Sequence, residues 1–460
     1  MKPIRRRRFL AQSAGIAGAV SLGSPRFCGA DSKQSRIGQP HFEGRAKTMI
    51  YLYMEGGPSQ IDLFDPKPTL DKLAGKPLPF EAPSTVFNTG NKVFPSPFKF
   101  RQFGESGSWV SELLPNLAQC VDDLTFVHSM HHEVSNHSAA CYLSHTGDAM
   151  AGRPSLGAWV NYGLGNLNQD LPGHVVLDCG QAPSGGAASW SHGFLPPDYS
   201  GVTFRKGTEP VEFIRPLEES RDEQQVKLNA IRQFQKASAA EAPHDGLVQS
   251  LEASYDVASR MQSIVPDVVG LQDESSLTRT MYGLDDPRTE VFGSRCLIAR
   301  RLVEQGVRFI EVFSPPVQAD RWDQHGQLEK GHRLNCAAVD RPIAGLIQDL
   351  KQRGLLDETI ILWGGEFGRT PSAQGGNGRD HNPFGYTVFM AGGGLKPGYH
   401  HGTTDEFGYY AETKKVHLHD LHATLLHQLG LDHERLTYRF GGRDYRLTDV
   451  YGRVVKELLA

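Results

Sequence analysis

The chain has 460 residues, of which 39% are hydrophobic and 22% charged, and its formal net charge is −4. This composition, with 50 glycines and 28 prolines, is typical of a globular protein with many loops and excludes fibrous and disordered chains. No basic patch is present, so nucleic acid is not an expected partner. At this length the chain can form one large domain or two.

The first thirty residues have the features of an export signal. They hold a basic run, two apolar residues after it, a stretch of small residues and a small-residue cleavage site, at Arg5–Arg8, Phe9–Leu10, Ala11–Leu22 and Cys28–Ala30. This pattern predicts a twin-arginine signal peptide over residues 1–30, export by the twin-arginine machinery and a periplasmic or secreted location. The alternative is a basic tail ahead of a surface helix.

Removal of this signal changes the properties of the mature chain. It takes away six basic residues and no acid, which leaves 42 basic against 52 acidic residues and a net charge of −10. No later stretch reaches the roughly 18 apolar residues of a membrane helix, so no transmembrane segment is expected. Residues 31–46 are polar and glycine-rich, and we interpret them as a linker. The remaining cysteines have no C-x-x-C spacing and are expected to be core thiols with at most one or two disulfides: Cys120, Cys141, Cys179, Cys296 and Cys336.

Short apolar runs predict buried strands at residues 48–54, 124–127, 175–177, 309–313, 359–363 and 386–390. Helical patterns predict helices at residues 109–118, 139–144, 292–304, 336–353 and 419–430, the last with Asp420 as its N-cap. Residues 66–108 are interpreted as a long excursion or small hairpin, and residues 211–284 as a helical insertion of two or three helices. The alternation of strands and helices predicts an α/β domain with a mostly parallel sheet.

Several of these strands end in loops that carry metal-ligand side chains. The carboxyl ends of parallel strands meet at one edge of a sheet, so we expect these side chains to converge. Carboxylates mixed with imidazoles, with no thiolate motif, favour one or two divalent ions such as Zn, Mn, Mg or Ca. Arg369 is expected to neutralise a bound anionic substrate. The candidate ligands are Glu55, Asp62, Asp323, His325, Glu366, Asp380 and His381.

Each candidate ligand also has a structural interpretation. The histidines of residues 128–137 are more often structural than ligands, and only one of them is expected to act at a site. For His417 and His419 the two interpretations balance. The structural alternatives for the others are a turn cap for Asp62, packing for Asp323 and His325, an exposed acid for Glu366, and a hydrogen-bonded loop pair for Asp380 and His381.

Five motifs together resemble a known family. In chain order they are GGPSQIDLFDPKP, WDQHG, GGEFGRTP, GRDH and HDLHATLLHQLGL. They are similar to the bacterial domain-of-unknown-function family 1501 over about residues 48–450, a family placed in the alkaline-phosphatase-like superfamily with sulfatases and phosphodiesterases. The resemblance implies an alkaline-phosphatase-like domain at residues 47–460, folded as a three-layer α/β/α sandwich. It also implies a site for one or two metal ions at the strand ends, to which Asp62, with Glu55 as its rival, would contribute the first acid.

The same resemblance locates the position of a nucleophile. In sulfatases a modified Cys or Ser opens a stretch that ends in Leu-Thr-Gly, and counting back from Gly147 places His137 at that position, with Ser138 next to it. The sulfatase arginine is absent, so formylglycine chemistry is not expected, and His137 can be a ligand, a base or a nucleophile. We expect an exported metal-dependent hydrolase of a small anionic phosphate or sulfate ester. The alternative is a non-catalytic exported binding or assembly protein that keeps the fold.

Overall fold

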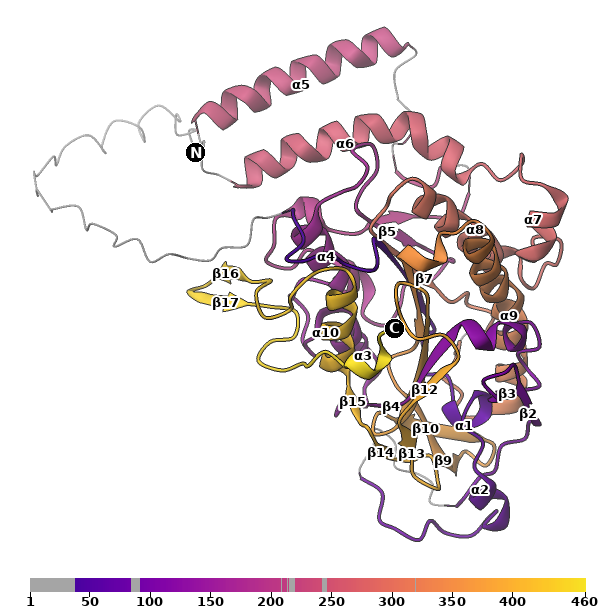
Figure 1. Cartoon of the computed structure of the whole chain (residues 1–460). Coiled ribbons are helices and arrows are strands. Elements are labelled where there is room, and N and C mark those ends of the chain that lie inside the picture. Colours follow the sequence, from indigo (N-terminus) through magenta and orange to yellow (C-terminus); the bar gives the residue numbers. More distant parts are fainter. Residues whose placement is uncertain are drawn as a thin grey trace, which may run out of the picture. The chain divides into compact units, whose positions relative to one another are not determined.

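A central β-sheet of nine strands organises the part of the chain that the structure describes (Figure 1). The structure is a computed structural model that describes residues 38–83, 92–207, 209–212, 214, 220–241, 246–318 and 320–460. The described residues belong to one compact unit, which spans residues 36–460. The predicted signal peptide, residues 1–30, lies outside the described residues.

The strands run in the order β12-β4-β11-β8-β1-β7-β5-β6, with β15 beside β4. Neighbouring strands are parallel except at β11, which is antiparallel to both β4 and β8. The predicted mostly parallel sheet is therefore confirmed. The bounds are β1 Thr48–Tyr53, β4 Leu124–His131, β5 His174–Leu177, β6 Val202–Phe204, β7 Phe309–Phe313, β8 Thr359–Gly364, β11 Tyr386–Ala391, β12 Tyr399–His401 and β15 Val416–His417.

The central strands are apolar throughout because both faces of the sheet are covered. On β1, Ile50 and Leu52 belong to the hydrophobic cluster on one face of the sheet, whereas Tyr51 and Tyr53 belong to the cluster on the other face. This alternation follows from the two-residue period of a strand. The register of β1 on β7 and β8 extends both clusters across the middle of the sheet.

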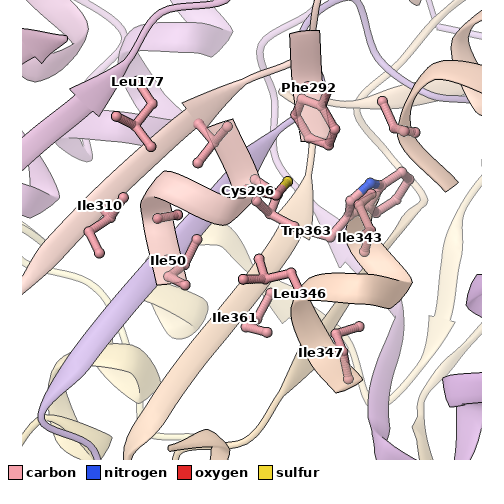
Figure 2. Packing of buried hydrophobic residues seen from close by; sticks show 14 of the residues in the cluster. Ile50, Leu177, Phe292, Cys296, Ile310, Ile343, Leu346, Ile347, Ile361 and Trp363 are labelled. Atoms are coloured by element: carbon pink, nitrogen blue, oxygen red, sulfur yellow. The ribbon is translucent and has the colours of Figure 1, made fainter. Parts of the chain in front are cut away.

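Helices cover the two faces and complete a three-layer α/β/α sandwich, as the family resemblance implied. Figure 2 shows the first layer, where Phe292, Cys296, Ile343 and Leu346 of two helices pack on the strands. The helices of this layer are α8 (Glu290–Glu304) and α9 (Leu328–Gln352), and those of the opposite layer are α3 (His137–Thr146), α4 (Leu156–Leu164) and α10 (Leu418–Gln428).

Smaller elements complete the described chain. Helices α5 (Arg221–Glu241), α6 (Gly246–Val269) and α7 (Ser276–Met281) lie in the region of the predicted insertion, and α5 and α6 lie side by side (Figure 1). Two short helices, α1 (Gln60–Leu63) and α2 (Pro68–Lys72), follow β1. Four antiparallel hairpins are formed by β2 (Phe100–Phe103) with β3 (Ser108–Ser111), β9 (Gly368–Gln374) with β10 (Gly378–Asn382), β13 (Thr403–Thr404) with β14 (Ala411–Thr413), and β16 (Tyr438–Phe440) with β17 (Arg443–Tyr445).

The helix predicted at residues 109–118 is wrong. Ser108–Ser111 form β3, and a 3₁₀ helix follows only at Leu117–Asp123. The apolar residues of this stretch alternate in burial, with Val110 fully buried and Trp109 exposed, which is the period of a strand. Pro115 lacks an N–H group and disfavours a helical residue before it, so no helix passes through this point.

Two helix starts also differ from the prediction. Helix α9 begins at Leu328, ahead of the predicted Cys336, because its first turns already bury apolar and polar side chains at helical spacing. The N-cap of α10 is His417, whose side chain accepts from a backbone amide of the first turn. Asp420 lies at the third helical position and accepts from the His417 amide, so it closes a capping box instead of being the cap itself.

The cysteines named above are buried free thiols, as expected of core residues. No helix of the described chain has the length and hydropathy needed to span a membrane. In the predicted linker, His41 and Ala46 donate backbone hydrogen bonds to the carbonyls of Gly430 and Gln428, so this part of it packs against the end of α10.

Candidate metal centre

Four ligand-type side chains meet near the carboxyl ends of the central strands. His137 is the first residue of α3, Asp323 and His325 lie in the loop between β7 and α9, and His381 lies on β10. One ligand atom from each residue lies within 4.8 Å of the other three. In the described part of the chain, this is the one group of three or more His, Cys, Asp or Glu side chains placed to hold a metal ion together. The fold thus brings three of the predicted ligands together and adds His137 to them.

The cluster is centred on one carboxylate oxygen. Oδ1 of Asp323 lies 2.9 Å from Nε2 of His325 and 3.2 Å from Nε2 of both His137 and His381. The Nε2 atoms of His325 and His381 are themselves 3.0 Å apart. Three imidazole nitrogens and one carboxylate oxygen form the donor set of a zinc-type site.

The second nitrogen of each imidazole donates to an acceptor outside the cluster. With Nδ1 protonated, a neutral ring directs the lone pair of Nε2 into the cluster, where the lone pairs of neighbouring rings repel each other. A cation removes this repulsion, and hydrogen bonds of this kind orient metal-binding histidines in general. The residues therefore fit a divalent metal. The acceptors are Glu366 for His137 at 2.5 Å, the Ser135 carbonyl for His381 at 2.6 Å, and the Gln374 amide oxygen for His325.

The electrostatics of the cluster favour positive charge at the same point. Burial raises the pKa of Asp323, but Arg369 and the three imidazoles outweigh burial and hold this pKa well below its ordinary value. Burial lowers the pKa of His381 to about 4, which keeps that ring neutral at pH 7. Burial also opposes protonation of His137, but its hydrogen bonds to Asp323 and Glu366 outweigh burial and raise its pKa to about 9. His137 therefore lies where a proton or a metal ion is most favoured.

Glu366 supports the cluster from behind. Its fully buried carboxylate accepts hydrogen bonds from the Tyr53 hydroxyl at 3.1 Å and the Gly56 amide at 2.9 Å, and it meets the cluster through His137. Its backbone carbonyl accepts from Nε2 of His132 at 2.6 Å. Glu366 was predicted as a ligand, and the structure gives it the position of a residue that orients one.

Asp62 does not join the cluster, contrary to the sequence interpretation. Its carboxylate pairs with Arg379, at 2.7 Å from Oδ2 to Nε and 3.1 Å from Oδ1 to Nη2, and both side chains are fully buried. The Ser59 hydroxyl donates a further bond of 2.5 Å. Asp62 thus has a structural partner for each oxygen. Arg379 is the residue that the sequence interpretation missed, although it stands in the GRDH motif.

Arg369 points at the cluster. Its side chain is fully buried, and its guanidinium donates to Oδ1 of Asp323 at 2.6 Å. It also donates to the backbone carbonyls of Gly57 and Arg379, at 3.0 and 3.1 Å, and to that of Gly56. Because its donors are committed to these acceptors, Arg369 fixes Asp323 in place. That it also neutralises a bound anionic substrate stays a prediction.

Two further predicted residues lie beside the cluster but outside it. Ser138 Oγ donates to the Ser184 carbonyl at 3.2 Å, and Oδ1 of Asp380 accepts from the His381 amide at 2.8 Å. Successive residues point about 100° apart on a helix and to opposite faces on a strand. Ser138 and Asp380 are therefore turned away because their neighbours in sequence, His137 and His381, are turned inward.

A cavity of 170 Å³ opens beside the cluster. Arg321 is buried at its wall and forms an ion pair with Glu55, and burial lowers the pKa of Arg321 to about 10, so it stays charged at pH 7. Helix α3 begins at this cavity with His137, and helix N-termini favour anions. The lining of this cavity thus sets one buried arginine and a helix N-terminus beside the carboxylates of Glu55, Asp320 and Asp323. Its lining residues are Glu55, Gly56, His137, Gln181, Ser184, Asp320, Arg321 and Asp323.

Known proteins resemble the chain in sequence and in fold. Residues 46–459 match the family model described as protein of unknown function (DUF1501). The chain belongs to this family. The match includes all four residues of the cluster and the hairpin that supplies His381. Among curated proteins, none matches the chain.

Solved structures with a similar fold include three bacterial proteins. Lipoteichoic acid synthase LtaP from Listeria monocytogenes is 10% identical with a TM-score of 0.32, over 85% of this chain and 74% of that one. Alkaline phosphatase from the Antarctic bacterium TAB5 is 10% identical with a TM-score of 0.34, over 85% and 98%. A sulfatase from Pseudoalteromonas sp. is 13% identical with a TM-score of 0.35, over 87% and 69%. These likenesses concern the fold and assign no reaction to this chain.

Proposed function

We propose that this protein is a divalent-metal-dependent hydrolase of phosphate or sulfate esters that acts outside the cytoplasm. The observation that carries the proposal is the convergence of three imidazole nitrogens and one carboxylate oxygen, with each imidazole oriented by a second hydrogen bond. Imidazole-rich sites suit Zn²⁺ better than Mn²⁺, Mg²⁺ or Ca²⁺, which prefer oxygen ligands. The twin-arginine pattern of residues 1–30 supports export to the periplasm or beyond it.

The residues divide into three roles in this proposal. Asp323, His325 and His381 would hold the ion, which when bound supplies a Lewis acid for an oxygen of the ester. The N-terminus of α3 and Arg321, which would exchange part of its pairing with Glu55 for the substrate, would bind the remaining oxygens of the anionic group. His137 borders the same cavity with its Nδ1 proton held by Glu366. A bound cation would oppose the second proton that Asp323 and Glu366 favour on this ring, and the neutral ring would then offer Nε2 as base or nucleophile.

The size of the cavity limits what it can take. At 170 Å³ it is smaller than the roughly 300–1,000 Å³ of pockets that enclose a drug-sized ligand. A phosphate or sulfate group would enter it, while the alcohol part of the ester would stay at the surface. We therefore propose a substrate that is recognised mainly through its anionic group.

A second candidate function follows from the number of donors in the cluster. Four protein ligands complete a tetrahedral zinc site, and closed sites of this kind are structural, whereas catalytic sites keep one position open. With His137 as the fourth ligand, the protein would be an exported binding or assembly protein that keeps an ion for stability. The role of His137 thus separates the two candidates.

Metal analysis and a substrate panel on three variants decide between them. His325→Ala removes a ligand, and His137→Ala opens the cavity side of the cluster. His400→Ala is the matched control, since its ring pairs with His128 at 2.9 Å and does not belong to the cluster. The panel contains aryl phosphates, phosphodiesters and aryl sulfates, and metal content is measured on each purified mature protein.

The hydrolase proposal expects a bound ion and ester cleavage in the wild type and the control, and loss of both in His325→Ala. His137→Ala should keep the ion and lose at least about 100-fold in rate, as expected for a lost base or nucleophile. A bound ion without cleavage of any substrate favours the binding protein. No bound ion, together with no rise in the thermal midpoint on adding Zn²⁺ or Mn²⁺, overturns the proposal.

A further inference from the structure

Glu311 is a carboxylate inside the apolar core. It lies at the centre of β7, is 1% exposed, and faces the layer that contains α3, α4 and α10. A buried charge at such a position is strongly unfavourable unless it is paired. The proposed chemistry does not use Glu311, so another role must explain why the core contains it.

Glu311 is paired with His145 of α3. Nε2 of His145 lies 2.6 Å from Oε1 of Glu311, and Nδ1 of the same ring donates to the Cys141 carbonyl at 2.7 Å. With Nε2 also protonated, the ring is a cation that faces the Glu311 carboxylate. Burial opposes both charges, but the pairing outweighs it, so the pKa of His145 is raised and that of Glu311 is lowered. His174 adds a weaker contact, 3.8 Å from the other oxygen.

His145 lies on the same face of α3 as His137. Residues 137, 141 and 145 are four apart, and such residues share one face of a helix. The His145 ring packs on Tyr53 with 4.5 Å between ring centroids, and the Tyr53 hydroxyl donates to Glu366, the partner of His137. One face of α3 thus links the Glu311 pair to the candidate metal centre, about 12 Å away along the helix.

Two histidines of α10 hold the same end of α3. Nε2 of His422 donates to the Ser144 carbonyl and Nε2 of His419 donates to the Gly147 carbonyl, both at 2.9 Å. These bonds satisfy carbonyls that the end of a helix leaves free. The carboxyl end of α3 is therefore fixed, while its first residue carries the side chain that enters the cluster.

We infer that Glu311 and His145 are positioning residues of the candidate metal centre, because their buried ion pair fixes α3 on β7 so that His137 reaches Asp323 and Glu366. The inference rests on the proposed function and adds the residues that keep its site in register. Apolar packing alone leaves a helix free to settle in neighbouring positions, whereas a charged pair at 2.6 Å defines one position. A displacement of about 1 Å at a site is enough to cost about 100-fold in function.

Two substitutions and a matched control test this role. Glu311→Ala removes the pair, whereas Glu311→Gln keeps an acceptor for His145 at the same place. Asp349→Ala is the control, because Asp349 is another buried carboxylate, paired with Arg300 at 3.1 Å and Tyr282 at 2.9 Å in the opposite helix layer. Zinc affinity is measured by competition with a chromophoric chelator, and amide hydrogen exchange of residues 139–142 is measured in the metal-free protein.

Glu311→Ala should bind zinc about 10–100-fold more weakly, the usual loss for a supporting residue, while Glu311→Gln and Asp349→Ala stay within about threefold of the wild type. Exchange of residues 139–142, in the first half of α3, should accelerate in Glu311→Ala and not in the control. If Glu311→Ala does not fold, the double variant Glu311→Leu/His145→Leu replaces it, since no buried charge is then left unpaired.

The outcomes separate this inference from the proposed function. Unchanged zinc affinity and unchanged exchange in folded Glu311→Ala overturn the inference and leave the metal site standing. Equal losses in Asp349→Ala also overturn it, because lower stability alone then explains them. If the wild type binds no zinc, the proposed function fails, and the exchange rates alone decide whether Glu311 positions α3.

Discussion

Asp62→Asn tests how much the buried ion pair between Asp62 and Arg379 contributes to stability. The substitution hardly changes the volume of the side chain, but it removes the charge opposite Arg379. Both side chains are fully buried, and removing one partner of such a pair costs about 3–5 kcal/mol because the other charge is left unpaired. Arg379 keeps its hydrogen bonds to the carbonyls of Phe94 and Thr370, at 2.9 and 3.1 Å. We therefore expect the lower end of this range, about 3 kcal/mol of unfolding free energy.

Urea unfolding followed by tryptophan fluorescence measures this loss. Asp286→Asn is the matched control, since Asp286 also accepts side-chain hydrogen bonds from an arginine at both oxygens, but that arginine, Arg288, is 72% exposed. Exposed pairs contribute about 0–1 kcal/mol, so the control should stay near the wild type. A loss in Asp62→Asn no larger than that of the control would refute the reasoning. Lost zinc binding at unchanged stability would restore Asp62 as a metal ligand.

Three further predictions follow from the contacts described above. Burial raises the pKa of Asp62, but the pairing with Arg379 outweighs burial and lowers the net pKa. The difference in unfolding free energy between the wild type and Asp62→Asn should therefore be full above about pH 4 and decrease below it. Urea unfolding at acid pH measures this difference. Gln374→Leu removes the acceptor of His325 and should weaken zinc binding about 10–100-fold by chelator competition; unchanged affinity contradicts this. Gly147→Ala should lower the thermal midpoint, because Gly147 has φ of 71° and a Cβ would lie 2.0 Å from the Leu447 carbonyl oxygen; an unchanged midpoint contradicts this.

The strands of the fold were predictable because their signal is local. A strand buried on both faces needs an unbroken apolar run, and the runs at residues 48–54 and 309–313 contain β1 and β7. The prediction for residues 109–118 was wrong because the local pattern there was ambiguous. The apolar residues of this stretch fit a helix or a strand equally well, and the choice was made by pairing with Phe100–Phe103, which is a tertiary contact.

The candidate site shows the same division. Strand ends predicted the meeting of Asp323 and His325 with the other loops, since parallel strands bring their carboxyl ends to one edge. The same argument also included Asp62, Glu366 and Asp380, which lie outside the cluster, and His381 reaches it from the separate β9–β10 hairpin. The sequence also singled out His137, although its role was left open. Gln374 and Arg321 carry no sequence signal that separates them from other polar loop residues, so their part in the site was missed.

The sequence by itself determined the buried strands, most of the helices and the ligand types at one edge of the sheet. Only the tertiary structure decided which carboxylate faces which cation. Asp62 and Arg379 are 317 residues apart, and Glu311 meets His145 across two layers. The physical reason is that apolar burial follows the period of the local backbone, whereas an ion pair forms wherever the fold removes two opposite charges from water together.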